Sequence, residues 1–116
     1  MKKIAVVLAA VALLATATPA GADHSRYHVK QQIRRAWKGR DVKAIRVANC
    51  ESSLNPNARS PGGTYLGLWQ FSRTTWKEYG GPGRDPRAVS AYRQTVIAWR
   101  LFRDRRWTPW PYCRSA

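Results

Sequence analysis

The chain has 116 residues, a length that suits one small domain and leaves no room for a second one of ordinary size. It carries 21 Lys and Arg residues against 6 Asp and Glu residues, so its formal net charge of +15 favours polyanionic partners at long range. Hydrophobic residues make up 44% of the chain, which excludes a disordered basic tail. We therefore expect a folded core.

Residues 1–22 have the organisation of a secretory signal peptide. Two lysines follow the first methionine, an apolar run covers residues 4–14, and residues 20–22 form an A-x-A cleavage signature. We expect cleavage after Ala22 and no stable membrane insertion afterwards, because the apolar run is too short to span a bilayer. An uncleaved membrane anchor is the alternative interpretation.

Cys50 and Cys113 are the two cysteines of the chain. Because an exported chain meets an oxidising compartment, we expect one disulfide between them. This disulfide would close a loop of 63 residues. In the chain-entropy description, such a cross-link would stabilise the fold by up to about 4 kcal/mol. The alternative is a metal site completed by His24 and His28, but the spacing fits no zinc pattern. We expect neither a metal nor an organic cofactor.

Two helices are predicted before the first turn-rich segment. Residues 26–38 place apolar side chains among many charges, which indicates a basic lead-in helix that ends at Gly39. Asp41 is the expected N-cap of a second helix, and Glu51 lies near the C-terminal end of that helix. Its predicted inward face consists of three apolar residues at helical spacing: Val42, Ile45 and Ala48.

The middle of the chain is rich in turn signals. Residues 55–64 contain Asn-Pro, Ser-Pro and Gly-Gly, and the aromatic run 65–71 is expected to form a small hairpin or a buried loop. Ser72 is the predicted N-cap of a short helix through Tyr79.

The longest helix is predicted over residues 86–104. Asp85 followed by Pro86 gives an N-cap and a proline at the first helical position. Prolines exclude a helix over residues 107–113, so the disulfide would tether this tail to the Glu51 helix. Two apolar stripes of the long helix are expected to face the core: Val89, Tyr92, Val96 and Trp99, and Ala91, Ala98, Leu101 and Phe102.

Glu51 is a carboxylate near an apolar helix face in a strongly basic chain. The desolvation at such a position and the C-terminal helix dipole both favour the protonated acid. The aromatic segment 65–76 offers an apolar wall beside it. A carboxyl group that keeps its proton near neutral pH suits general acid catalysis of glycosidic bond cleavage. The alternative is that Glu51 is a surface ion-pair partner of an arginine.

Several ordered motifs give the sequence a family resemblance. Glu51-Ser52, the Asn-Pro-Asn-Ala run at residues 55–58, Gly-Leu-Trp-Gln-Phe at residues 67–71 and Thr-Trp at residues 75–76 resemble the soluble lytic transglycosylase family. The Cys-Glu-Ser start at residues 50–52 and the closing Trp-Pro-Tyr-Cys at residues 110–113 also resemble the resuscitation-promoting factor type of this domain. The resemblance covers about residues 42–114.

This resemblance implies a single lysozyme-like domain of the α+β class, mainly helical, with a small hairpin or loop region and one disulfide. The catalytic domain would span residues 41–116, after the basic lead-in 23–40. The implied reaction is cleavage of the β-1,4 bond between N-acetylmuramic acid and N-acetylglucosamine in peptidoglycan. The implied location is extracellular and associated with the cell wall.

The motifs also suggest which residues form the site. Glu51 matches the catalytic acid/base and Gln70 the cleft glutamine of the family. The expected substrate-binding residues are Tyr65, Trp69, Gln70, Thr75 and Trp76. One departure concerns Tyr92, which is followed by Arg93 where lytic transglycosylases commonly carry asparagine, so Tyr92 is read as a core residue.

No second catalytic carboxylate stands out. Glycosidases that use two acids hold them about 5–10 Å apart, and the remaining acids are placed at caps, among helical charges or near the start of the mature chain: Asp23, Asp41, Glu78, Asp85 and Asp104. A single-acid mechanism that yields a 1,6-anhydro sugar is therefore favoured. A hydrolytic muramidase acting on the same bond is the alternative.

The expected partners are peptidoglycan glycan strands and, through the net charge, anionic cell-wall polymers, with the protein acting as a monomer. A nucleic-acid-binding domain is the strongest rival, because arginines at positions 100, 103, 105 and 106 are suited to bind phosphates. Export argues against nucleic acid as a partner. A cationic wall-binding module with an inert Glu51 is the third possibility.

Overall fold

The computed structural model describes residues 26–116. The predicted signal peptide, its cleavage site, Asp23 and His24 lie outside the described residues. Residues 26–36 are helical, and five further helical elements follow: α2 (Asp41–Ser52), the short 3-10 helix η1 (Pro61–Gly63), α3 (Arg73–Glu78), the short 3-10 helix η2 (Pro86–Ala88) and α4 (Ala91–Arg105). Across residues 26–116, no helix is both long and apolar enough to cross a membrane.

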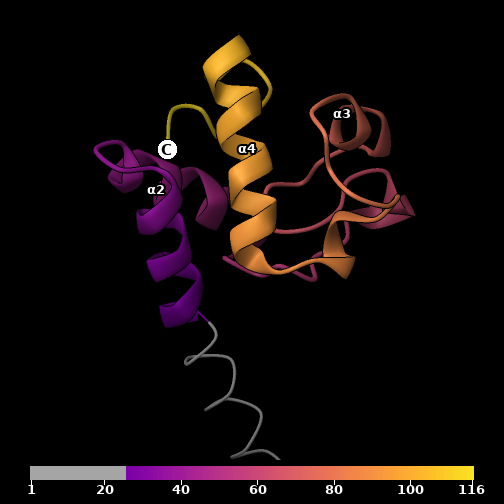
Figure 1. The fold of residues 1–116 in the computed structure, drawn as a ribbon, viewed down its shortest axis with the longest axis horizontal. Coiled ribbons are helices and arrows are strands. Elements are labelled where there is room, and N and C mark those ends of the chain that lie inside the picture. Colours follow the sequence, from indigo (N-terminus) through magenta and orange to yellow (C-terminus); the bar gives the residue numbers. More distant parts are fainter. Residues whose placement is uncertain (1–25) are drawn as a thin grey trace, which may run out of the picture.

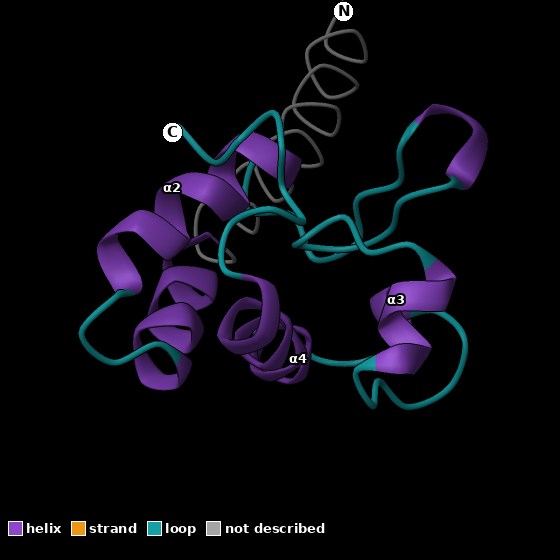
Figure 2. Ribbon diagram, turned by 90° about the horizontal axis from the view of Figure 1, so that it is seen from above, coloured by secondary structure: helices purple, strands orange, loops and turns teal. Residues whose placement is uncertain are grey.

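Helix α4 runs through the middle of the molecule, with α2 on one side and α3 on the other (Figure 1). Figure 2 shows helices joined by long loops, and the described part of the chain forms no extended sheet. Two isolated antiparallel bridges join Leu66 to Arg59 and to Phe71, where a hairpin or loop was expected. This mainly helical fold with one disulfide confirms the predicted fold class.

The lead-in helix packs into the core rather than lying entirely on the surface. It ends at residue 36, before a turn that includes Gly39. Its buried side chains are Val29 and Ile33, and the following Trp37 is also fully buried. Tyr27 stays exposed because it falls outside this stripe.

Two predictions about α2 are wrong. Asp41 is the first residue of the helix, and Arg40 precedes it at the N-cap without a side-chain cap; the Asp41 carboxylate instead lies 3.8 Å from the Arg34 guanidinium. Val42 is 63% exposed and Ile45 only partly buried. The buried face is shifted by about one residue around the helix and consists of Ala44, Val47 and Ala48.

Helix α3 begins as predicted, since the Ser72 hydroxyl accepts a hydrogen bond from the backbone N–H of Thr75. The long helix does not begin at Pro86. Asp85 caps the separate element η2, and the extended Val89 ends it. Ser90 is the N-cap of α4, where its hydroxyl accepts from the N–H of Arg93.

The buried face of α4 follows the second predicted stripe more closely than the first. Tyr92 is 38% exposed, and the Arg35 guanidinium lies 4.9 Å from the centre of its ring. The core reading of Tyr92 is therefore wrong, because the helix turns a different face inward. The residues of α4 that are buried are Gln94, Thr95, Ile97, Ala98, Leu101 and Phe102.

A cluster of aromatic rings forms the centre of the core. Trp37 stacks on Trp69 at 5.2 Å between ring centres and also contacts Trp99 and Phe102. The indole N–H groups of Trp37 and Trp69 both donate to Thr95, one to its carbonyl and one to its hydroxyl. These bonds allow two large polar-tipped rings to be buried without an unsatisfied donor.

The predicted disulfide is present. Cys50 and Cys113 are joined with a Cα–Cα separation of 5.8 Å. Residues 107–113 form turns rather than a helix, as their prolines predict. The bond therefore holds this C-terminal segment beside the end of α2, one residue before Glu51.

Candidate active site

Glu51 lies in the last turn of α2, half-buried, at the edge of a cleft. The cleft walls around it come from two segments that are distant in the sequence. Tyr65 and Gln70 belong to the loop after η1, and the C-terminal tail supplies the opposite wall with four residues: Pro109, Trp110, Pro111 and Tyr112. This half of the cleft has a volume of about 270 Å³.

The surroundings of Glu51 favour its neutral form. Burial raises the pKa of the Glu51 carboxyl above its ordinary value, and the C-terminal end of a helix acts in the same direction. Among the described residues, the two ion pairs are Arg34–Asp41 and Arg87–Asp85, so Glu51 is in neither. The surface ion-pair interpretation is therefore wrong for this residue.

The residue after Glu51 fixes the end of α2 onto the loop between η1 and α3, residues 64–72, which we call the cleft loop. The Ser52 hydroxyl donates to the Leu68 carbonyl at 2.7 Å and accepts from the backbone N–H of Asn55 at 3.2 Å. Ser53, the C-cap, has a left-handed φ of 56° and returns a backbone bond to Asn49. The Glu-Ser pair thus combines a cleft acid with the anchor that positions it.

Gln94 clamps the same loop from the side of α4. Its side chain is fully buried, its carbonyl accepts from the backbone N–H of Leu68 at 2.8 Å, and its amide donates to the carbonyls of Pro56 and Val89. Gly67 has a φ of 85°, and a Cβ there would lie 2.5 Å from the Gln94 carbonyl oxygen. Gln94 therefore has a structural role.

Gln70 occupies the centre of the cleft and is shared by both of its halves. Its backbone has a left-handed φ of 52°, which is strained for a residue other than glycine. Its side-chain amide donates to the Gly67 carbonyl at 2.9 Å, leaving its own carbonyl available to a ligand. Tyr65 beside it is 49% exposed and also lines both halves.

Two of the expected substrate-binding residues, both tryptophans, are buried. Trp69 and Trp76 are both 0% exposed. Trp69 lies in the cleft wall, with its ring stacked on Trp37, and the Trp76 indole donates to the Pro82 carbonyl beneath Gly81. The core therefore covers both rings, and neither offers an open face for stacking.

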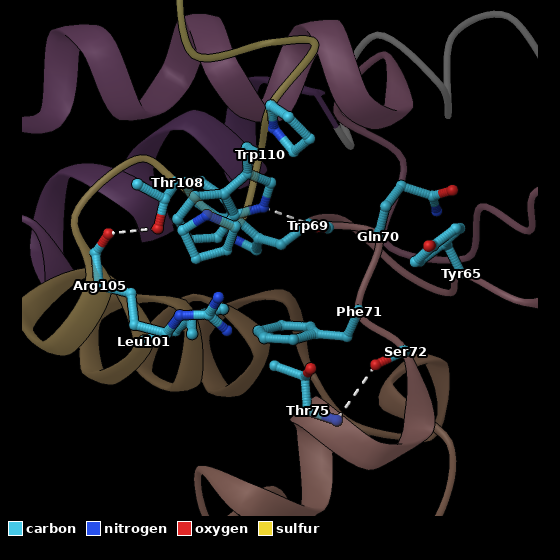
Figure 3. Close-up of a pocket in the computed structure, with 12 residues that line it drawn as sticks. Tyr65, Trp69, Gln70, Phe71, Ser72, Thr75, Leu101, Arg105, Thr108 and Trp110 are labelled. Atoms are coloured by element: carbon cyan, nitrogen blue, oxygen red, sulfur yellow. Dashed lines mark hydrogen bonds between the residues drawn. The ribbon is translucent and has the colours of Figure 1, made fainter.

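The second half of the cleft extends toward α3 and the end of α4, with a volume of about 330 Å³ (Figure 3). Tyr65 and Gln70 lie on one side of it, and Arg105 and Thr108 on the other. Thr75, half-buried, lines this part as expected. Residue types alone did not reveal Arg105 or the tail as cleft residues; the tether at Cys113 was the one available signal for the tail.

The other described carboxylates do not line the cleft. Asp41 faces Arg34, Asp85 is paired with Arg87 at 2.8 Å, and Asp104 accepts a hydrogen bond from the Tyr79 hydroxyl. Glu78 is exposed on α3. Residues 26–116 also contain no group of three or more His, Cys, Asp and Glu side chains that could hold a metal ion.

The sequence comparisons agree with this geometry. The transglycosylase-like domain family matches residues 37–113, which include Glu51, the cleft loop and both cysteines. The chain belongs to this family. The matched region of this transglycosylase-like domain begins at Trp37, whose ring lies at the centre of the aromatic core.

The curated relatives are resuscitation-promoting factors. Resuscitation-promoting factor RpfC of Mycobacterium tuberculosis is 40% identical over 70 residues, 60% of this chain and 49% of the relative. RpfD of the same species is 36% identical over 78 residues, 67% of this chain and 49% of the relative. Rpf1 of Corynebacterium glutamicum is 38% identical over 73 residues, 61% of this chain and 37% of the relative. The chain thus spans half or less of the length of these relatives.

Proposed function

We propose that this chain cleaves the β-1,4 bond between N-acetylmuramic acid and N-acetylglucosamine in peptidoglycan, with Glu51 as the acid/base. The observation that carries the proposal is that Glu51 is the one carboxylate, among the described residues, that lines the cleft. The family membership and the resuscitation-promoting relatives support the same reaction class.

Glu51 first acts as a general acid. Its raised pKa keeps a proton on the carboxyl group, which transfers to the glycosidic oxygen as the bond from that oxygen to the muramic acid C1 breaks. The neighbouring N-acetyl group of the substrate stabilises the cation left on the sugar. Gln70 and Tyr65 line the cleft beside Glu51 and are positioned to orient the sugars.

Glu51 then acts as a general base. Its carboxylate accepts the proton of the sugar 6-hydroxyl, and that oxygen forms a bond to C1. The product is a 1,6-anhydro sugar, Glu51 regains its proton and no water is consumed. This sequence needs one carboxylate, whereas two-acid glycosidases need a second one about 5–10 Å away.

The proposed setting is extracellular and associated with the cell wall. The Cys50–Cys113 disulfide supports an oxidising compartment. The formal net charge of +15 supports accumulation on anionic wall polymers through a field that salt screens. The protein is proposed to act as a monomer with no cofactor.

The experiment measures soluble fragments released from purified peptidoglycan by the exported, disulfide-bonded chain. Glu51→Gln removes the titrating proton and keeps the shape of the side chain, so the release rate should fall by about 10²–10⁴-fold. Glu78→Gln is the matched control, since Glu78 is exposed outside the cleft. Equal release by the wild-type chain and Glu51→Gln would exclude Glu51 as the acid. No release by a folded wild-type chain would favour the wall-binding alternative.

A further inference from the structure

The half of the cleft farther from α2 contains one cation among neutral residues. Arg105 lies at the end of α4, and Figure 3 shows its side chain extending over Leu101 toward Phe71 and Thr75. No lining residue of this half is acidic. The cleft is therefore polarised, with a carboxyl group in one half and a guanidinium group in the other.

The Arg105 guanidinium makes no ion pair within the described residues. The adjacent acid, Asp104, accepts a hydrogen bond from the hydroxyl of Tyr79 instead. The Arg105 carbonyl is held by the Thr108 hydroxyl at 2.7 Å, which fixes the backbone from which the side chain extends. The guanidinium thus keeps its donors available in the cleft.

Two hydroxyl groups lie in the same half of the cleft. The Ser72 oxygen accepts from the backbone N–H of Thr75, so its own proton is left for a further acceptor. The Thr75 side chain also lines this half. A guanidinium fork with neighbouring hydroxyl donors is the donor set that binds a carboxylate.

The two halves form one continuous cleft. They share Tyr65, Gln70, Pro109, Trp110 and Pro111 in their lining. A polymer whose reactive bond lies at Glu51 therefore extends its neighbouring groups toward Arg105. In peptidoglycan, the groups that branch from the glycan strand are short peptides, and these peptides carry carboxylates.

We propose that Arg105 binds a carboxylate of the peptide attached to the glycan strand and so makes the cleft selective for strands with charged peptides. The identity of the polymer rests on the proposed function, whereas the carboxylate preference rests on the Arg105 half of the cleft alone. Arg105 acts here through substrate binding and has no part in the proton transfers at Glu51.

The test measures binding to the full chain carrying Glu51→Gln, so that nothing is cleaved. The probes are a soluble tetrasaccharide with free peptide carboxylates and the same compound after its carboxylates are converted to amides. We expect Kd to be about tenfold lower for the free form, as one charged hydrogen-bonded contact implies. Adding Arg105→Gln should remove the difference, and Arg105→Lys should restore part of it.

Arg103→Gln is the matched control, because Arg103 is exposed on the same helix and does not line the cleft. It should keep the tenfold preference, and thermal unfolding should show that Arg105→Gln is folded. Equal binding of the two probes to the parent, no binding of the free form, or a preference that survives Arg105→Gln would overturn the proposal. A preference without any cleavage by the wild-type chain would overturn the proposed catalysis and support the carboxylate site.

Discussion

At the scale of the residue, the environment of Glu51 separates it from the other carboxylates. Asp41 and Asp85 each lie beside a guanidinium group, and Asp104 accepts a hydrogen bond from the Tyr79 hydroxyl. Burial, by contrast, raises the pKa of Glu51. The Glu51 carboxyl group thus stays outside the ion pairs of a chain that is rich in arginine. Its proton affinity follows from this placement at the end of α2.

In the proposed mechanism, the raised pKa of Glu51 sets the pH dependence of turnover. The general acid must hold its proton, so kcat/KM should remain high above the ordinary glutamate pKa of about 4.3 and fall as pH rises through the pKa of the folded enzyme. Initial rates of fragment release across a pH series measure this limb. A rate that keeps increasing through the alkaline range would contradict Glu51 as the acid.

The raised pKa of Glu51 also makes the free energy of unfolding depend on pH. A carboxyl group whose pKa is raised on folding binds its proton more tightly in the folded state, so this stabilisation is present below the unfolded pKa and is lost as pH rises through the folded pKa. Glu51→Gln should therefore unfold at a higher temperature than wild type at neutral pH, and at the same temperature near pH 3. Thermal unfolding with Glu78→Gln as control measures the difference. A neutral-pH midpoint below that of wild type would contradict the assigned burial.

Only some of the residues of this site could be located from the sequence alone. Glu51 and Gln70 could be located because motif and spacing place them directly. Trp69 and Trp76 could not be assigned correctly, since burial depends on distant partners: Trp37 covers one ring, and the 80–82 turn covers the other. Arg105 joins the cleft through the tertiary position of the end of α4.

At the scale of the element, the cleft loop is held between α2 and α4. The Ser52 hydroxyl donates to the Leu68 carbonyl, and the Gln94 side-chain carbonyl accepts from the Leu68 N–H. The two helices therefore hold both backbone polar groups of this one residue. Gly67 is required at the start of this loop because its left-handed backbone brings the chain against the Gln94 side chain. The loop then presents Gln70 to the cleft.

Gly67→Ala should destabilise the fold by two effects, backbone strain and a clash. Gly62 has a nearly identical φ of 84° with no atom within 4 Å of an added Cβ, so Gly62→Ala reports the strain alone. We expect a loss of about 1 kcal/mol for Gly62→Ala and at least about 2 kcal/mol more for Gly67→Ala. Denaturant unfolding measures both. Equal losses would show that contact with Gln94 does not constrain the loop.

Some features of the helices were predicted correctly and others were not. Ser72 begins α3 as expected because a serine cap is a local signal. Asp85 and Pro86 give an equally good local signal, but it starts the short η2, and the extended Val89 separates η2 from α4. The inward face of α2 was predicted wrongly because apolar spacing alone does not show that Val42 faces solvent while Ala44 faces the core.

At the scale of the whole molecule, the disulfide joins the helix that carries the acid to the tail that forms the opposite cleft wall. Cys113 directly follows the four wall residues 109–112, and Cys50 directly precedes Glu51. The Trp110 indole also donates to the Trp69 carbonyl at 3.0 Å. The cleft is therefore assembled from both ends of the family domain.

Replacing both cysteines by serine should cost about 2–4 kcal/mol of stability. It should also raise KM more than it lowers kcat, because the tail wall is proposed to bind substrate while Glu51 stays on α2. Denaturant unfolding and initial rates below the unfolding midpoint measure these effects. An unchanged KM in the folded variant would show that Trp110 alone positions the tail.

In the proposed mechanism, a single carboxyl group, Glu51, cleaves the glycan strand without water. The most direct measurement is mass spectrometry of the fragments released from purified peptidoglycan in water enriched in heavy oxygen, with Glu51→Gln alongside. We expect unlabelled fragments with 1,6-anhydro ends that disappear in the variant. Reducing ends that carry the heavy oxygen would make the enzyme a hydrolase and contradict the anhydro mechanism, and fragments that persist in Glu51→Gln would contradict the catalytic role of Glu51.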